Sequence, residues 1–103
     1  MILMHISSPD IDLLKVIAEK LLKENYVADV RIDNISRLTL KEGKLQEVPR
    51  YLLACKTKAL LFTPIVDFLK QTLRQPLPEI YALPLVNIEY QHEQEIRSRT
   101  KAV

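Results

Sequence analysis

Pro78-Glu79-Ile80-Tyr81-Ala82-Leu83-Pro84 places one acid and a short apolar run between two prolines. Proline fixes its own φ angle, lacks an N–H donor and drives the preceding residue towards extended geometry. A helix cannot pass through such a segment, so a short strand is expected there. We predict this strand over residues 79–86, with the carboxylate of Glu79 at its start.

Two amphipathic helices are predicted upstream of this strand. The first covers residues 10–24 and follows Ser8-Pro9-Asp10, which offers a capping hydroxyl, a proline for the first turn and an early acid. The second begins at Thr63-Pro64 or a few residues earlier. Its apolar side chains recur at helical spacing, namely Phe62, Ile65, Val66, Leu69 and Leu73. Each helix therefore has one face suited to packing on a sheet.

Three further strands are expected. The apolar start, residues 1–7, forms the first, and residues 51–57 form a buried one. Between them, residues 26–33 alternate apolar and charged side chains, the period of a half-buried strand. The chain resumes around residues 38–40 and turns at the only glycine, Gly43, which marks a hairpin. Pro49 requires a bulge or an edge position, because proline cannot donate to a ladder.

The element order is strand, helix, strand, strand, helix, strand. This order predicts an α+β fold of the ferredoxin-like βαββαβ type, a sandwich of an antiparallel sheet with two helices on one face. We expect one domain over residues 1–103, with the core in residues 1–86. The tail, residues 87–103, is rich in Glu, Gln and Arg, so any short helix there should be weakly amphipathic and poorly held.

The composition indicates which classes of partner and which cellular compartment suit the protein. Fifteen basic and 13 acidic residues give a net charge of +2, which does not favour nucleic acid or an anionic membrane. The apolar start is too short to span a bilayer. The single cysteine, Cys55, cannot form an internal disulfide, so a reducing cytoplasm is expected.

Both faces of the sheet are expected to be apolar. In residues 51–57, Leu53 and Cys55 point one way while Leu52 and Ala54 point the other, and residues 79–86 repeat this arrangement. Two helices cover only one face, and a large uncovered apolar face indicates an interface. An obligate oligomer is therefore predicted. The alternative is that the tail folds back over the second face, although it has few apolar residues to do so.

Four short motifs in order resemble the CutA divalent-cation tolerance proteins, small trimeric ferredoxin-like proteins similar in build to the PII signalling proteins. The matching segments are Ser8-Pro9-Asp10, Glu42-Gly43-Lys44-Leu45, Lys56-Thr57, and Pro78-Glu79 with Leu83-Pro84. Each motif is weak alone, but their order and spacing over residues 6–85 fit the family without gaps. The chain resembles a divergent member, because the cysteines usual in the family's first two strands are Ile6 and Ala28 here. Leu73-Arg74-Gln75 likewise replaces the usual His-Pro-Tyr.

The resemblance implies a non-enzymatic homotrimer that acts in divalent metal ion tolerance or in PII-like ligand sensing through inter-subunit clefts. It carries over Lys56 and Glu79 as ligand contacts, with Lys44 as a third candidate. A solvated lysine, a salt bridge between strands and an exposed turn neighbour are the structural alternatives for these residues. A function of another class, a structural or adaptor trimer that binds a protein partner, also fits the sequence.

Metal ligands are the weakest candidates. A divalent ion could use Cys55, Asp29 or Asp33, but a soft-metal site needs several converging thiolates or imidazoles. His5 and His92 are also available, in the first strand and in the tail. None of these residues has the close spacing of a zinc or copper motif, so direct copper sequestration is not favoured. No glycine loop for phosphates and no nucleophile paired with a histidine is recognisable, so catalysis is not expected.

Overall fold

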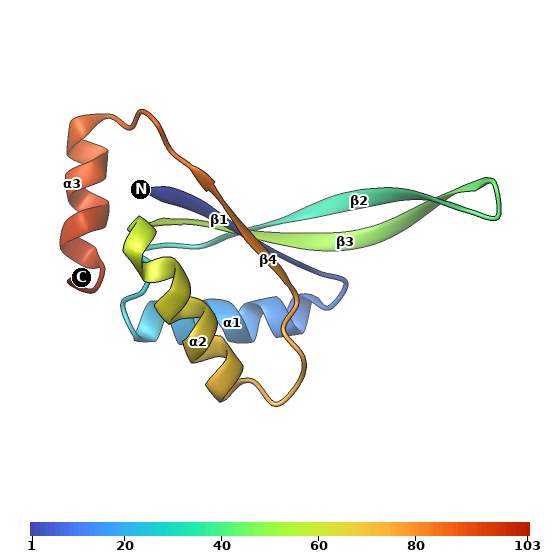
Figure 1. The fold of residues 1–103 in the computed structure, drawn as a ribbon, viewed down its shortest axis with the longest axis horizontal. Helices are drawn as coiled ribbons and strands as arrows, with labels where there is room; N and C mark the ends of the chain where they lie inside the picture. The colour runs from blue at the N-terminus through green and yellow to red at the C-terminus, as the bar shows by residue number, and fades with distance from the viewer.

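The computed structural model describes residues 1–103, with four strands and three α-helices arranged as a ferredoxin-like α+β sandwich (Figure 1). The elements are β1 (Ile2–Ser8), α1 (Ile11–Lys23), β2 (Arg31–Lys41), β3 (Lys44–Thr57), the 3-10 turn η1 (Ala59–Leu61), α2 (Phe62–Thr72), β4 (Glu79–Pro84) and α3 (Tyr90–Arg99). The fold class expected from the sequence is thereby confirmed.

The sheet has the strand order β2-β3-β1-β4, and every neighbouring pair is antiparallel. In β1, Met4 lies opposite Cys55 of β3 on one side and Ala82 of β4 on the other. Because successive side chains of a strand point to opposite faces, these residues and their second neighbours share one face. Helices α1 and α2 pack on that face and form the second layer of the sandwich.

The core lies between this helical layer and the sheet. Its fully buried side chains come from both layers and include Met4, Ile6, Leu14, Ile17, Leu21, Leu53, Ile65 and Leu69, all with zero exposure. The apolar spacing of α1 explains this burial, since residues three and four apart share a face of a helix. No helix is both long and apolar enough to cross a membrane.

Beyond the end of β1, strands β2 and β3 continue as a two-stranded ribbon. We call residues 35–50 the arm, because there the two strands pair only with each other. The arm projects far from the helical layer (Figure 1), and the molecule measures 48 × 33 × 19 Å. It closes in a two-residue turn with positive φ at Glu42 (53°) and Gly43 (75°), which suits the twist of a hairpin.

The second strand begins later and runs further than expected. The alternation of residues 26–33 predicts a strand there, but β2 begins at Arg31 and continues without a break to Lys41. The preceding residues instead anchor the end of α1: Asn25 has φ 58°, and the amide of Tyr26 donates to the carbonyl of Leu21. Helix termination therefore takes precedence over the alternating pattern in this segment.

Two helix starts differ from the sequence pattern. Asp10, not Ser8, caps α1, since its carboxylate accepts hydrogen bonds from the amides of Asp12 and Leu13. Pro9 precedes the helix and is not part of its first turn. α2 begins at Phe62, immediately after η1, and has no side-chain cap. The earlier start allowed for α2 is thus the correct one.

The environment of Pro49 and the end of β4 also differ from what the sequence predicts. Pro49 lies in the arm opposite Ser36, where β3 has β2 on one side and no strand on the other. The register passes through it without a bulge, so the edge position is correct and the bulge is not. β4 ends at Pro84 and not at residue 86, although the amide of Leu85 still donates to the carbonyl of Met1.

The C-terminal tail is held much more firmly than its composition indicates. Helix α3 buries Ile96, which is 5% exposed, against the end of the sheet opposite the arm (Figure 1). The guanidinium of Arg99 donates to the carbonyl of Ala28, and the Nζ of Lys58 donates to two carbonyls that follow α3, those of Thr100 and Lys101. The prediction of a poorly held tail is therefore wrong, because polar contacts to the backbone replace the missing apolar ones.

Candidate functional site

The face of the sheet opposite α1 and α2 carries the candidate residues Lys56, Glu79, Asp33 and His5. We call it the open face. Register and alternation assign to it Leu3, His5 and Ser7 of β1, Arg31, Asp33, Ile35 and Arg37 of β2, Arg50, Leu52, Ala54 and Lys56 of β3, and Glu79, Tyr81 and Leu83 of β4. Tyr81 is 42% exposed and Leu83 is 44% exposed. Apolar and charged side chains are thus mixed on a surface that α1 and α2 leave uncovered and that α3 reaches at the Lys56 end.

Glu79 lies in a polar cluster where the arm leaves the sheet. The Nη2 of Arg37 donates to the Oε2 of Glu79 at 2.5 Å, and this pair links β2 to β4, the two outer strands of the sheet. Arg50 donates from Nε to the Oγ of Ser7 at 3.0 Å and from Nη2 to the carbonyl of Ser7 at 3.1 Å. We call Ser7, Arg37, Arg50 and Glu79 the arm-root cluster.

The electrostatics of the arm-root cluster favour an ionised Glu79. The hydrogen bond from Arg37 lowers the pKa of the Glu79 carboxyl from its ordinary value, and the charges of Arg37 and Arg50 act in the same direction. The side chains of Arg37 and Glu79 remain 39% and 46% exposed, so solvent weakens their attraction. The cluster has two guanidinium groups and one carboxylate, and it orients the arm relative to β4.

Lys56 lies at the opposite end of the open face. It faces Leu3 of β1, whereas Glu79 faces Ser7, so four residues of β1, or about 13 Å, separate the two positions. The Nζ of Lys56 contacts the Nε2 of His92 in α3 at 3.3 Å. The structural alternative of a salt bridge between strands holds for Glu79, which pairs with Arg37 of β2, whereas Lys56 forms no ion pair.

A small cavity adjoins Lys56. It has a volume of about 60 Å³ and is lined by Leu3, Asp29, Arg31, Ala54, Cys55 and Lys56. We call it the strand-end pocket. Arg31 in this lining also binds Asp33, with 3.2 Å between its Nε and a carboxylate oxygen. Basic and acidic groups thus meet here at the junction of β2, β3 and the segment before β2.

The metal candidates do not assemble into a site. No group of three histidine, cysteine, aspartate or glutamate side chains converges in the structure. Cys55 points into the core, and burial, together with the nearby charge of Asp29, raises the pKa of its thiol to about 12. No second thiolate or imidazole converges on it, as a soft-metal site requires. Asp33 is engaged with Arg31, and His5 faces the hydroxyl of Tyr81 at 3.1 Å.

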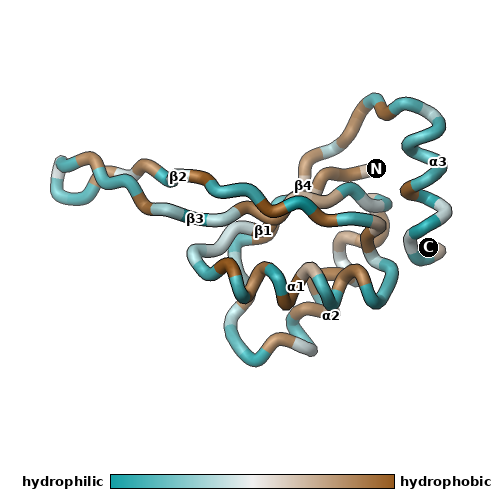
Figure 2. Tube along the Cα trace, turned by 180° about the vertical axis from the view of Figure 1, so that it is seen from behind, coloured by the Kyte–Doolittle hydropathy of each residue, from teal (hydrophilic) through white to brown (hydrophobic).

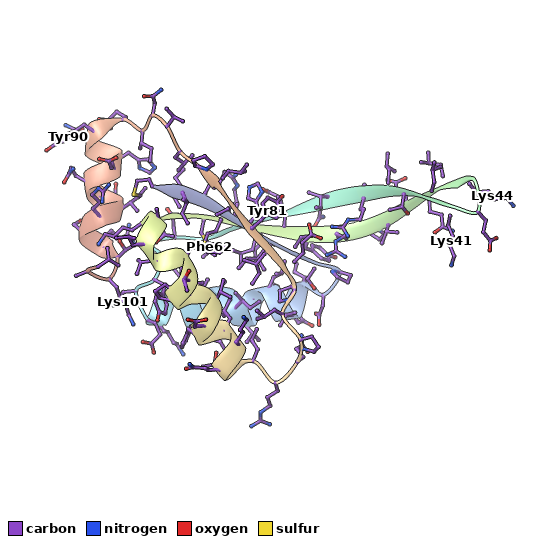
Figure 3. The ribbon with its side chains drawn as sticks, viewed as in Figure 1. Lys41, Lys44, Phe62, Tyr81, Tyr90 and Lys101 are labelled. Carbon is purple, nitrogen blue, oxygen red and sulfur yellow. The ribbon has the colours of Figure 1, made fainter.

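Lys44 lies apart from the other candidates. It stands at the tip of the arm beside Lys41, far from the sheet region that carries Tyr81 (Figure 3). The structure therefore does not bring Lys44, Lys56 and Glu79 into one site within a single chain. Lys56 and Glu79 share the open face only.

Sequence reasoning did not identify Ser7, Arg37 and Arg50, and it considered His92 only as a metal ligand, not as a partner of Lys56. Arg37 and Arg50 are ordinary polar positions in a predicted hairpin, and only the register of β1, β3 and β4 brings them to Ser7 and Glu79. His92 reaches Lys56 because α3 packs on the end of the sheet. No local pattern encodes either approach.

A second hollow lies on the helical layer, away from the open face. A groove of about 400 Å³ runs between α1 and the end of α2, with Leu13, Val16 and Leu73 as its apolar residues. Charged and polar side chains complete its lining, namely Asp10, Asp12, Lys20, Thr72, Arg74 and Gln75. The segment Leu73-Arg74-Gln75, which departs from the CutA pattern, thus forms part of this surface.

Comparison with known proteins gives a consistent result. A model of the CutA1 divalent ion tolerance protein family matches residues 2–98. The solved structure of CutA1 from Pyrococcus horikoshii is similar at a TM-score of 0.82 and 20% identity, with 99% of this chain and 100% of that chain covered. No curated protein is similar enough to the chain to match it.

Two further solved structures agree. The divalent cation tolerance protein from Thermus thermophilus has a TM-score of 0.79 at 25% identity, with 98% and 100% of the two chains covered. The protein from Archaeoglobus fulgidus, named a periplasmic divalent cation tolerance protein CutA, has a TM-score of 0.80 at 24% identity with the same coverage. Family model and fold therefore lead to the same group of proteins.

Proposed function

The chain belongs to the CutA1 divalent ion tolerance protein family, and from that premise we propose that it forms a homotrimer with a role in the response to divalent metal ions. In this assembly the open faces and arms of the three copies cover one another. The clefts between copies bind a small ligand or ion, in the manner of a PII-like sensor. The protein carries out no reaction of its own.

One observation carries the assembly: large apolar side chains lie in water on the arm. Leu38, Leu40 and Leu45 are 60%, 73% and 69% exposed. Leu40 pairs with Leu45 across the ribbon, and Leu38 lies two residues from Leu40, so the three share one face. Figure 2 places these apolar stretches outside the helical layer. An isolated two-stranded ribbon is marginal in water, so a second copy is the natural cover for this face.

The same assembly would complete the ligand sites. Lys56 and Glu79 both point to the open face, at its two ends, so a neighbouring copy laid on that face would approach each of them. The proposal of a cleft site rests on this placement together with the family resemblance. A divalent ion in such a cleft would use carboxylates from more than one copy, since one chain converges no three ligands.

The experiment measures mass and binding on the purified full chain. Static light scattering at micromolar concentration should give three times the chain mass of 12.0 kDa. Equilibrium titration of the trimer with Cu²⁺, Zn²⁺, nucleotides and common anions should then give saturable binding of at least one of them. A monomer would reject the assembly, and a trimer that binds none of these probes would reject the sensing role.

An adaptor function remains the second proposal, and the groove between α1 and the end of α2 favours it. This groove lies on the helical layer, so it would stay accessible after the open faces associate. Val16, which lines it, is 46% exposed. The variant Val16→Asp should abolish capture of a protein partner and leave the mass of the trimer unchanged.

A cytoplasmic location is also a proposal. It rests on the single cysteine, which is buried and forms no disulfide. The Archaeoglobus fulgidus relative is named periplasmic, so the location needs a direct test. Fractionation of the native host should recover the protein with cytoplasmic markers, and recovery with periplasmic markers would reject the proposal.

A further inference from the structure

We propose that Lys56, positioned by His92, holds a small oxyanion, a carboxylate or phosphate group, in the strand-end pocket. The inference deepens the proposed function, on which it rests, by naming the chemical class of the cleft ligand. It also assigns α3 a part in binding, through a histidine that the family resemblance did not indicate.

The first observation is the incomplete environment of the Lys56 ammonium. Lys56 is partly buried near the end of β3, and its Nζ contacts the Nε2 of His92 at 3.3 Å. The structure has six ion pairs, and none of them includes Lys56. An ammonium has three N–H donors, so two remain after the contact with His92. A partly desolvated cation in this state gains from an oxyanion placed beside it.

Neighbouring basic residues, unlike Lys56, have oxygen acceptors for their N–H groups. Arg37 and Arg31 each bind a carboxylate, and Lys58, two residues after Lys56, donates to the carbonyls of Thr100 and Lys101. Each of these cations thus has an oxygen acceptor within the chain. Lys56 has an imidazole nitrogen in place of an oxygen, and the imidazole carries no compensating negative charge.

The second observation is the space beside Lys56. The strand-end pocket has a volume of about 60 Å³, and a single water needs roughly 10–15 Å³ by the same kind of measure. A carboxylate or phosphate group therefore fits. Arg31 adds a second cation to the lining, with one edge of its guanidinium still open beyond the Asp33 contact. The lining holds two cations, Arg31 and Lys56, against the exposed Asp29, while Asp33 outside the lining pairs with Arg31, so Lys56 is the cation without a carboxylate partner.

The third observation is the fixed position of His92. The Glu89 carboxylate caps α3 and accepts hydrogen bonds from the amides of Gln91 and His92, at 2.7 and 3.1 Å. The far end of the helix is tied to the body of the protein by Arg99 and by the burial of Ile96. The imidazole is therefore held on the Lys56 side of the sheet. Its Nε2 lies 3.3 Å from the Nζ of Lys56, a residue of the pocket lining, so the ring restricts the positions of the ammonium.

The test titrates the purified full chain with inorganic phosphate and, separately, with acetate. Binding is measured by calorimetry and by the NMR signals of the His92 ring. Saturable binding of either probe is expected, with a shift of those signals. Phosphate alone would identify a phosphate group as the ligand moiety, and acetate alone a carboxylate. The variant Lys56→Gln should weaken binding about tenfold, the usual effect of losing a charged hydrogen bond.

Two further variants separate this site from general attraction of anions. Lys44→Gln makes the same charge change at the tip of the arm and should leave the affinity within about twofold. His92→Phe keeps a ring of similar size but removes the nitrogen, and should weaken binding about threefold. Equal losses in Lys56→Gln and Lys44→Gln would overturn the proposal, as would wild-type protein that binds neither probe.

Light scattering on the same samples keeps this inference distinct from the proposed function. A trimer that binds neither probe rejects the oxyanion site and leaves the assembly standing. A monomer rejects the assembly, whereas Lys56-dependent binding by that monomer still supports the oxyanion site.

Discussion

The helix-covered half of the sheet and the arm belong to the same two strands, β2 and β3, yet their side chains have opposite environments. In the covered half, Leu53 of β3 has zero exposure and faces α1 and α2. In the arm, Leu45 of the same strand is 69% exposed. The pairing register continues through both regions without interruption.

The difference shows that strand pairing and core formation are separate requirements. The register carries the hairpin far beyond the helices, but hydrogen bonds alone contribute little net stability in water. The covered half is stabilised by its own core, whereas the arm exposes leucines that one chain cannot bury. We therefore expect core substitutions to affect folding and arm substitutions to affect association.

The largest effect is expected in the core. Leu53→Ala removes a fully buried side chain and leaves a cavity between β3 and the helices. The free energy of unfolding should fall by about 2–5 kcal/mol in urea denaturation at fixed protein concentration. Leu60→Ala, at a position that is 72% exposed, is the matched control and should change it by less than about 0.5 kcal/mol. Equal losses in both variants would contradict the assignment of the core.

The next effect concerns the arm. The double variant Leu40→Glu with Leu45→Lys replaces a cross-strand apolar pair by an ion pair, so the hairpin is retained while its apolar face is removed. Association should weaken by about 3 kcal/mol or more per chain, and light scattering should detect dissociation with an unchanged far-UV circular dichroism spectrum.

The control for the arm uses the opposite face of the ribbon. Thr39→Glu with Gln46→Lys introduces the same charges at the adjacent cross-strand pair, and it should leave the assembly intact. If both double variants dissociate equally, the leucine face is not the contact. If neither dissociates, the arm plays no part in assembly.

A smaller effect is expected at α3, which tests whether the tail belongs to the covered half. Ile96 is the buried residue of this helix, and Ile96→Ala should cost about 2 kcal/mol. Hydrogen exchange of the amides in residues 90–99 should become faster, while that of β1 stays slow. Val86→Ala, at a site that is 86% exposed, should alter neither. Unchanged exchange in Ile96→Ala would mean that the polar contacts suffice.

The smallest effect is expected in the arm-root cluster. Because Arg37 lowers the pKa of Glu79 in the folded state, the ionised carboxylate stabilises the protein above the ordinary pKa of 4.5. This stability is lost as the pH falls through the lowered value. Glu79→Gln should therefore be less stable than wild type at pH 7, with a smaller difference at pH 3.

Glu42→Gln at the arm turn is the control for this pH dependence. Glu42 forms no ion pair, so its substitution should give no difference in stability at either pH. A pH-independent difference for Glu79→Gln would mean that shape, and not charge, decides the role of this residue.

Much of the covered half could be read from the sequence because its rules are local. Helical spacing in α1, the two prolines around β4 and the glycine at the arm turn each act over a few residues. Errors arose where two local signals competed, as at residues 26–30, where helix termination prevailed over alternation. The firm attachment of the tail could not be predicted because its anchors are backbone carbonyls, which no side-chain pattern records.

The candidate sites were likewise predictable only in part. Lys56 and Glu79 could be selected from the sequence through short motifs, but their partners could not. Arg37 meets Glu79 across two intervening strands, and His92 meets Lys56 through the docking of a helix 36 residues away in sequence.

The sequence by itself determined the order of the elements and the ferredoxin-like fold, since backbone preferences and apolar periodicity act between near neighbours. Tertiary structure decided the length of the arm, the firm docking of α3 and the partners of Arg37, Arg50 and Lys56 on the open face. These depend on strand register and on packing between distant segments, where a charged side chain pairs with whichever group the fold brings within reach.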